Sequence, residues 1–175
     1  MAQYDLIIRG GTIVDGTGAP GFAGDVAVKD GVIVAVGQIT GSAAQEIDAS
    51  GKVVAPGFVD IHTHYDGQAT WDPVLAPSSW HGATTIVFGN CGVGFAPVRQ
   101  QHQQALIEMM EGVEDIPGIT LTEGLKWDWE SFPEYLDVLE GLPHAIDIAI
   151  LINQLCCGLF TDSRNSREVV AWVTA

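Results

Sequence analysis

GFVDIHTH, residues 57–64, is an apolar run that ends on two histidines. This run predicts a strand covered on both faces, as the strands of parallel sheets are. In a strand, residues i and i+2 point to the same face, with their Cα atoms about 7 Å apart. His62 and His64 would therefore project together at the carboxyl end of the strand, where parallel α/β folds place their active sites. Such a pair can bind a divalent ion, or it can be a hydrogen-bonded pair of core or rim histidines.

The next strand along the chain is followed by a cysteine. The segment ATTIVFGNCGVG, residues 83–94, predicts a second strand and a glycine-rich turn that carries Cys91. If the two strands are neighbours in a parallel sheet, Cys91 lies at the same edge as His62 and His64. A thiolate beside two imidazoles suits zinc best among the common ions, although most free cysteines are small buried apolar residues.

The residues before this region predict a small all-β segment. GDVAVKDGVIVAVG, residues 24–37, is typical of a hairpin, because Asp-Gly favours tight turns between β-branched runs. Glycine punctuates the other strand-like runs of residues 4–55, and none of them has a helical period. We therefore predict a β-rich, sandwich-like N-terminal domain segment over residues 1–55 and an α/β domain over residues 56–175.

The second segment alternates strands and helices, which indicates the start of a parallel (β/α) array. An apolar stripe predicts a helix over residues 98–112, and Ser131 with Glu134 forms a capping box for a second helix that Gly141 ends. AIDIAILI, residues 145–152, predicts a third buried strand, and residues 166–173 indicate the beginning of another helix. Three strands cannot close a barrel, which takes about 250 residues, so the expected barrel is incomplete and leaves one sheet edge and an apolar face uncovered.

Composition restricts the partners. Acidic residues outnumber basic ones 22 to 7, which argues against nucleic acid or an anionic membrane as a partner. No run approaches the ~18 apolar residues of a membrane span, and the N-terminus lacks the pattern of a secretion signal. The chain has 3 cysteines, an odd number that favours a reducing compartment, so we expect a cytoplasmic protein.

Several motifs together resemble the amidohydrolase superfamily, and within it the D-aminoacylase (N-acyl-D-amino-acid deacylase) branch. The superfamily's metal site begins with an H-x-H like that of GFVDIHTH, and GNCGVGFAP at residues 89–97 is the most specific match to the branch. EGVEDIPG at residues 111–118 and WDWESFPEYLDVL at residues 127–139 also match. The resemblance covers residues 4 to 150, which correspond to the first third of such an enzyme.

The resemblance implies a metal-dependent, TIM-like (β/α) barrel hydrolase that cleaves N-acyl-D-amino acids to a carboxylate and a D-amino acid. It implies one or two zinc ions per site, with Cys91 in the tightly held position and His62 and His64 in a second, looser one. The partner would be a small-molecule substrate, and an oligomer is possible. The general base and two further histidine ligands are expected beyond residue 175, so we expect the 175-residue chain alone to be incomplete and inactive.

Two alternatives stay open: a cyclic-amide hydrolase of the hydantoinase or dihydroorotase kind, and an inactive fragment that at most binds metal. The first shares H-x-H but usually uses a carboxylated lysine where this chain offers Cys91. The residues after position 150 do not resemble the family. Asp66 is a weak candidate for orienting an imidazole through a hydrogen bond. We expect the remaining candidates to be structural or surface residues, namely the acidic run Glu108, Glu111, Glu114 and Asp115, and the histidines His81, His102 and His144.

Overall fold

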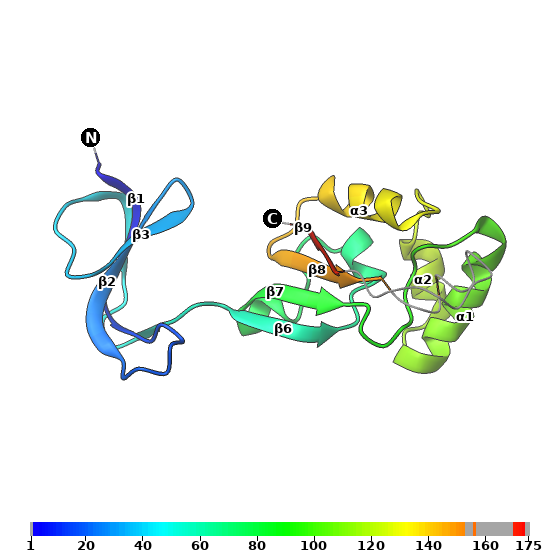
Figure 1. Ribbon diagram of the computed structural model, residues 1–175, viewed down its shortest axis with the longest axis horizontal. Helices are drawn as coiled ribbons and strands as arrows, with labels where there is room; N and C mark the ends of the chain where they lie inside the picture. Colours follow the sequence, from blue (N-terminus) through cyan, green and yellow to red (C-terminus); the bar gives the residue numbers. More distant parts are fainter. Residues whose placement is uncertain (1, 153–155, 157–169, 174–175) are drawn as a thin grey trace. The chain divides into compact units, whose positions relative to one another are not determined.

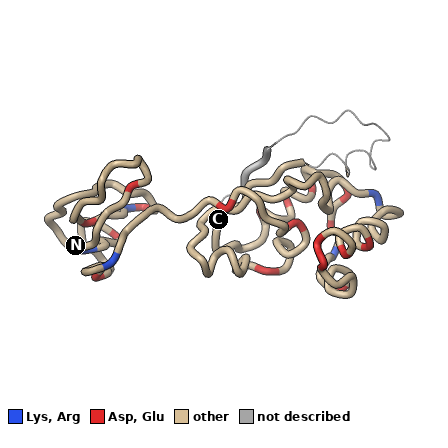
Figure 2. The backbone as a smooth tube through the Cα atoms, turned by 90° about the horizontal axis from the view of Figure 1, so that it is seen from below, with Lys and Arg blue, Asp and Glu red and all other residues tan. Residues whose placement is uncertain are grey.

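The structure is a computed structural model that describes residues 2–152, 156 and 170–173 of the chain. The chain divides into two compact units, Met1–Pro56 and Gly57–Ala175. Acidic residues are spread over both units, and several lie on the helices of the second (Figure 2). Within the described residues, no helix is long and apolar enough to cross a membrane.

The first unit is a β-sheet, as predicted (Figure 1). Its strand order is β3-β2-β1-β4, and β5 also pairs with β1. Asp30 and Gly31 form the predicted hairpin turn between β2 and β3, with φ values of 51° and 75°. The described strands of this unit form one sheet, so a sandwich-like second layer stays a prediction. The strands are β1 (Tyr4–Ile13), β2 (Phe22–Lys29), β3 (Val32–Gly37), β4 (Ala43–Asp48) and β5 (Val53–Val54).

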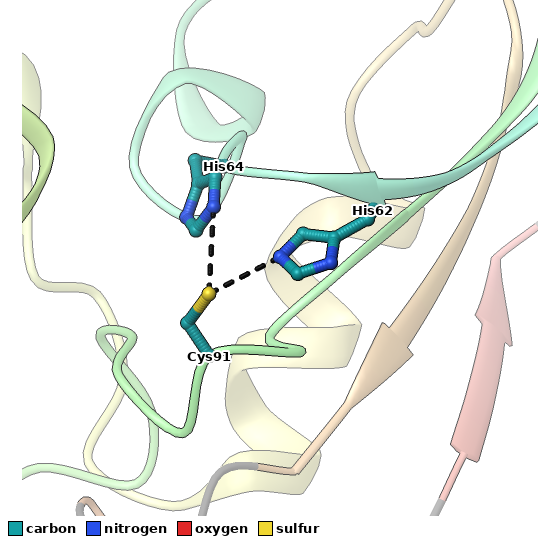
Figure 3. A group of neighbouring side chains, drawn as sticks. All are labelled: His62, His64 and Cys91. Atoms are coloured by element: carbon teal, nitrogen blue, oxygen red, sulfur yellow. Dashed lines mark hydrogen bonds between the residues drawn. The ribbon is translucent and has the colours of Figure 1, made fainter.

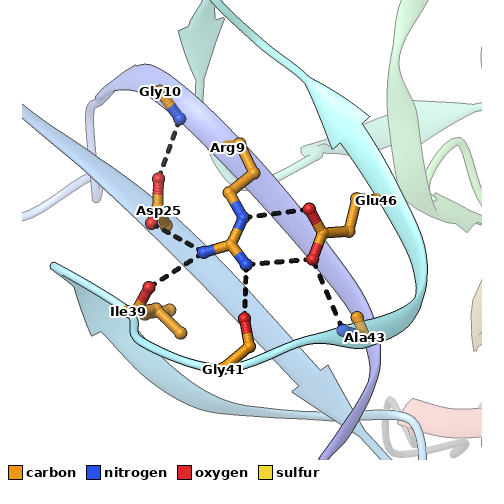
Figure 4. Close-up of polar contacts among 7 residues, drawn as sticks. All are labelled: Arg9, Gly10, Asp25, Ile39, Gly41, Ala43 and Glu46. Atoms are coloured by element: carbon orange, nitrogen blue, oxygen red, sulfur yellow. Dashed lines mark hydrogen bonds and ion pairs between the residues drawn. The ribbon is translucent and has the colours of Figure 1, made fainter. Parts of the chain in front are cut away.

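Arg9 joins three strands of this sheet with all its guanidinium nitrogens (Figure 4). Its Nε and Nη2 donate to both carboxylate oxygens of Glu46 on β4, at 3.2 and 2.9 Å. Its Nη1 donates to Asp25 on β2 at 3.2 Å, and further bonds reach the carbonyls of Ile39 and Gly41. Bidentate geometry of this kind fixes direction as well as charge, so Arg9 sets the register between β2, β1 and β4.

The second unit is built on a sheet of order β6-β7-β8-β9. The first three strands are parallel, as predicted, and the capping box of Ser131 and Glu134 starts α3. The short helix α2 was not predicted. The elements are β6 (Phe58–Thr63), β7 (Ala83–Phe88), β8 (Asp147–Leu151), β9 (Val170–Val173), α1 (Gln103–Glu114), α2 (Gly118–Gly124), α3 (Phe132–Glu140), and the short 3-10 helices Gln68–Thr70, Ser79–His81 and Gln100–His102.

One predicted element of the second unit is wrong. The segment expected to begin a helix contains β9 instead, which pairs antiparallel with β8; residues 166–169 lie outside the described residues. Val170 and Val173 are β-branched and favour a strand where a free sheet edge offers a ladder. The helix expected over residues 98–112 is α1, which begins at Gln103 and buries Leu106, Ile107 and Met110.

The core lies on one face of this sheet. Ile86 and Phe88 of β7 pair in register with Ile148 and Ile150 of β8, and all four are fully buried or nearly so. Residues of all three helices belong to the same buried cluster, namely Leu106 and Met110 of α1, Leu121 of α2, and Tyr135 and Leu139 of α3.

Strand β6 differs from the other parallel strands in its exposure. Phe58, Val59 and Ile61 are 69%, 55% and 70% exposed, which contradicts the expected burial on both faces. The physical reason is that β6 is the edge strand of the described sheet and pairs only with β7 there. The uncovered edge and apolar surface expected of an incomplete barrel are therefore present.

Candidate metal centre

The candidate centre lies at the carboxyl edge of β6 and β7. These strands are parallel, and their last paired residues are Thr63 and Phe88, so the segments that follow leave the sheet at the same edge. His62 is the penultimate residue of β6, and His64 is the first residue after the strand. The register shifts between Asp60 and Thr63, where β6 carries one more residue than β7. Such a bulge changes the direction in which local side chains point.

The turn that carries Cys91 is fixed by its backbone and by one amide side chain. Gly89 has φ +87°, and a Cβ there would clash with the carbonyl oxygen of Leu151, so only glycine fits. Asn90 Nδ2 donates to the Ile61 carbonyl at 3.0 Å, which ties the turn to β6. These contacts bring Cys91 over the end of the neighbouring strand.

The three side chains converge (Figure 3). Cys91 Sγ lies 3.1 Å from His62 Nε2 and 3.6 Å from His64 Nε2. One potential ligand atom from each residue lies within 4.8 Å of the other two. Bonds of about 2.3 Å from zinc to sulfur and about 2.0 Å to nitrogen would separate S from N by about 3.6 Å across a tetrahedral ion. The donor set and its spacing therefore fit zinc with small side-chain adjustments.

The centre is open to solvent. His62 and Cys91 are exposed and His64 is half-buried. Structural zinc sites are closed by four protein ligands, whereas catalytic sites keep a position for water or substrate. Three candidate ligands on an exposed edge leave room for a further ligand, a water or a substrate.

Asp66, two residues after His64, is a buried acidic residue. It is 4% exposed, and within the described part of the chain its Oδ2 has no hydrogen-bond partner. Burial raises the pKa of Asp66 to about 7, the negative charge of Glu114 adds to this, and a hydrogen bond from the Gly89 backbone opposes it. The Gly89 contact links the segment after β6 to the turn that carries Cys91. That Asp66 orients an imidazole through a hydrogen bond stays a prediction.

The other histidines lie outside the cluster. His81 is exposed at the end of a 3-10 helix, and His102 contacts Gln101. His144 Nε2 lies 2.9 Å from the Ala69 carbonyl, a structural contact. Cys156 is buried, and its thiol donates to the Gly94 carbonyl.

Glu114 was expected on a solvated helix face, and that expectation is wrong. Its Oε1 lies 3.0 Å from His64 Nδ1, and its side chain is only 14% exposed. Helical periodicity could not reveal this contact, because Glu114 lies at the last residue of α1, where the chain turns toward the sheet edge. The only sequence signal for Glu114 was the EGVEDIPG motif, which does not indicate which residues lie near Glu114 in the folded chain.

Comparison with known proteins agrees with this architecture. The profile of the amidohydrolase family (Amidohydro_3) matches residues 45–156, which include all three candidate ligands. The chain belongs to the amidohydrolase family. The D-aminoacylase of Alcaligenes xylosoxydans xylosoxydans is 35% identical over 150 residues, which are 85% of this chain and 29% of that protein. The predicted resemblance to the D-aminoacylase branch is thus confirmed.

Solved amidohydrolase structures match the fold as well. A D-aminoacylase with a binuclear metal centre has a TM-score of 0.71 and 38% identity, covering 86% of this chain and 30% of that one. The N-acyl-D-glutamate deacylase of Bordetella bronchiseptica, in complex with zinc and a phosphonate inhibitor, has a TM-score of 0.69 and 37% identity, covering 86% and 29%. This amidohydrolase chain therefore spans less than a third of the length of the relatives it matches.

Proposed function

We propose that His62, His64 and Cys91 bind zinc, and that the protein hydrolyses N-acyl-D-amino acids to a carboxylate and a D-amino acid. The observation that carries the proposal is the convergence of two imidazoles and a thiol from two adjacent parallel strands. The similarity to a D-aminoacylase and to a zinc-containing deacylase supports the substrate class. Because the chain spans under a third of these relatives, the activity is proposed for the whole protein.

The described residues would have distinct parts in this chemistry. His62 and His64 would bind as neutral imidazoles through Nε2, and Cys91 would bind as a thiolate, the mixed set that zinc prefers. The glycine turn and the Asn90 contact would hold Cys91 in place while the exposed edge admits a small substrate. Bound zinc would supply a Lewis acid for the amide carbonyl, either alone or with a second ion. A cytoplasmic location is also part of the proposal, because the odd number of cysteines in the sequence favours a reducing compartment.

A cyclic-amide hydrolase is less well supported. Enzymes of that kind share the H-x-H pattern, but they usually have a carboxylated lysine as the bridging ligand. Here the side chain that contacts both imidazoles is Cys91. The thiol therefore favours the deacylase.

Two measurements test the proposal: zinc binding by the purified chain, and the classes of amide that the complete protein hydrolyses. Equilibrium dialysis of the purified chain should give about one zinc per chain. The Cys91→Ala variant and the His62→Ala/His64→Ala double variant should lose it, whereas His81→Ala, an exposed histidine outside the cluster, should not. The complete protein should release amine from N-acetyl-D-amino acids faster than from the L enantiomers or a hydantoin. Zinc that persists in both ligand variants, or preference for the cyclic amide, would contradict the proposal.

A further inference from the structure

The contact between Glu114 and His64 goes beyond the three candidate ligands. Glu114 Oε1 lies 3.0 Å from His64 Nδ1, on the side of the ring away from Cys91. The opposite nitrogen, Nε2, lies 3.6 Å from Cys91 Sγ and points into the cluster (Figure 3). The imidazole thus lies between a carboxylate and the candidate metal position, using one nitrogen for each.

This arrangement determines which nitrogen holds the proton. A neutral imidazole carries one N–H, and either nitrogen can hold it. A carboxylate oxygen accepts hydrogen bonds and donates none, so a 3.0 Å approach is favourable only if Nδ1 of His64 carries the proton. Nε2 then keeps its lone pair, which is the form that binds a metal.

The backbone holds Glu114 in this place. Buried Leu106 and Met110 anchor α1 on the core, and the helix ends at Glu114. Asp115 then turns the chain with a φ of 54°, and the backbone N–H of Gly118 donates to Glu111 Oε1 at 3.1 Å. The carboxylate is therefore presented to His64 by a fixed turn and not by a mobile side chain alone.

The location of this carboxylate also indicates a cationic partner. Negative charge at the carboxyl end of a helix opposes the helix dipole, and the last turn of α1 has no basic residue. The Glu114 carboxylate and the Cys91 thiol beside these imidazoles form a site whose charge a divalent cation would balance.

We propose that Glu114 is the positioning residue of the metal centre: it holds the Nδ1 proton of His64 and directs Nε2 to the ion. This inference rests on the proposed zinc site. It assigns a function to the second glutamate of EGVEDIPG, a residue that was expected on a solvated helix face. Hydrogen-bond partners of this kind fix the ring orientation of a ligand and raise its basicity.

The first measurement is the tautomer of His64 in the metal-free protein. Nitrogen-15 NMR at about pH 8.5, above the range in which imidazoles ordinarily carry charge, should show the proton on Nδ1 in the wild type. Glu114→Ala should lose this preference. Glu108→Gln, a change of an exposed carboxylate on the same helix, should keep it, and His64→Gln assigns the signal. A wild-type His64 protonated on Nε2 would overturn the proposal.

The second measurement is zinc affinity by competition with a chelator. Glu114→Ala should weaken binding by about 10- to 100-fold. Glu114→Gln, whose amide oxygen can still accept the Nδ1 proton, should retain more affinity, and Glu108→Gln should match the wild type. Equal affinity in Glu114→Ala and Glu108→Gln would overturn the positioning role. A wild type that binds no zinc would contradict the proposed zinc-dependent function. The tautomer measurement would still test whether Glu114 holds the Nδ1 proton of His64, because it uses metal-free protein.

Discussion

Removal of one buried hydroxyl, in Tyr135→Phe, should destabilise the second unit by a predictable amount. The Tyr135 hydroxyl donates to the Asp66 carbonyl at 2.6 Å, and the side chain is 2% exposed. Burial raises the pKa of Tyr135 above its usual value, with smaller contributions from Asp66 and Cys156, so the hydroxyl stays a donor throughout the neutral range. Phenylalanine fills the same space but leaves a buried carbonyl without this donor, which costs about 1–3 kcal/mol.

Urea unfolding followed by tryptophan fluorescence measures this cost. All 5 tryptophans lie beyond residue 57, so the signal reports the second unit. The ring of Trp129 lies 4.9 Å from that of Tyr135 and is buried beside it. Tyr4→Phe, in the first unit, is the matched control and should leave the transition unchanged. A Tyr135→Phe transition within about 0.5 kcal/mol of the wild type would refute the reasoning, because it would mean that the Asp66 carbonyl does not depend on this donor.

Three further changes test the surroundings of the site. Ser131→Ala removes the side chain that accepts from the Glu134 backbone N–H, and it should lower the free energy of unfolding of the second unit by about 1 kcal/mol in urea titrations. Gly89→Ala should lower the free energy of unfolding by at least about 1 kcal/mol and displace the turn that carries Cys91. Thermal unfolding and zinc affinity measure these effects, and Gly112→Ala, where a Cβ meets open space, is the control. Burial raises the pKa of Asp66 to about 7 in the folded protein. Between pH 4 and 7 this carboxyl therefore ionises only in the unfolded chain, so the free energy of unfolding falls as the pH rises, by at most about 1.4 kcal/mol per pH unit. Asp66→Asn should remove that slope in chelator-treated protein, and an unchanged slope would contradict the burial of the charge.

Much of the fold follows from local sequence. The Asp30-Gly31 turn, the capping box at Ser131 and the apolar runs of β7 and β8 act through neighbouring residues, and each was predicted correctly. The segment at Val170–Val173 was not, because its choice between helix and strand depends on the free edge of β8, a distant partner.

The candidate ligands could be predicted from the sequence alone. An H-x-H at the end of one strand and a cysteine after the next are sufficient to predict convergence, because parallel strands end at a common edge of the sheet. The family could be predicted in the same way, through motifs that short segments carry. These features need only the period of a strand and the direction of its neighbour.

How those candidate ligands are held depends on the packing of distant segments. The extra residue of β6 between Asp60 and Thr63 alters the alternation on which the H-x-H argument depends, and it arises from pairing with β7. Glu114 comes to His64 because packing of α1 and the turn at Asp115 bring together residues that are distant in the chain. Burial of Asp66, which raises its pKa, is likewise a property of the packed core. The physical reason is common to all three: strand pairing, packing and desolvation depend on contacts between distant segments, and no local pattern encodes them.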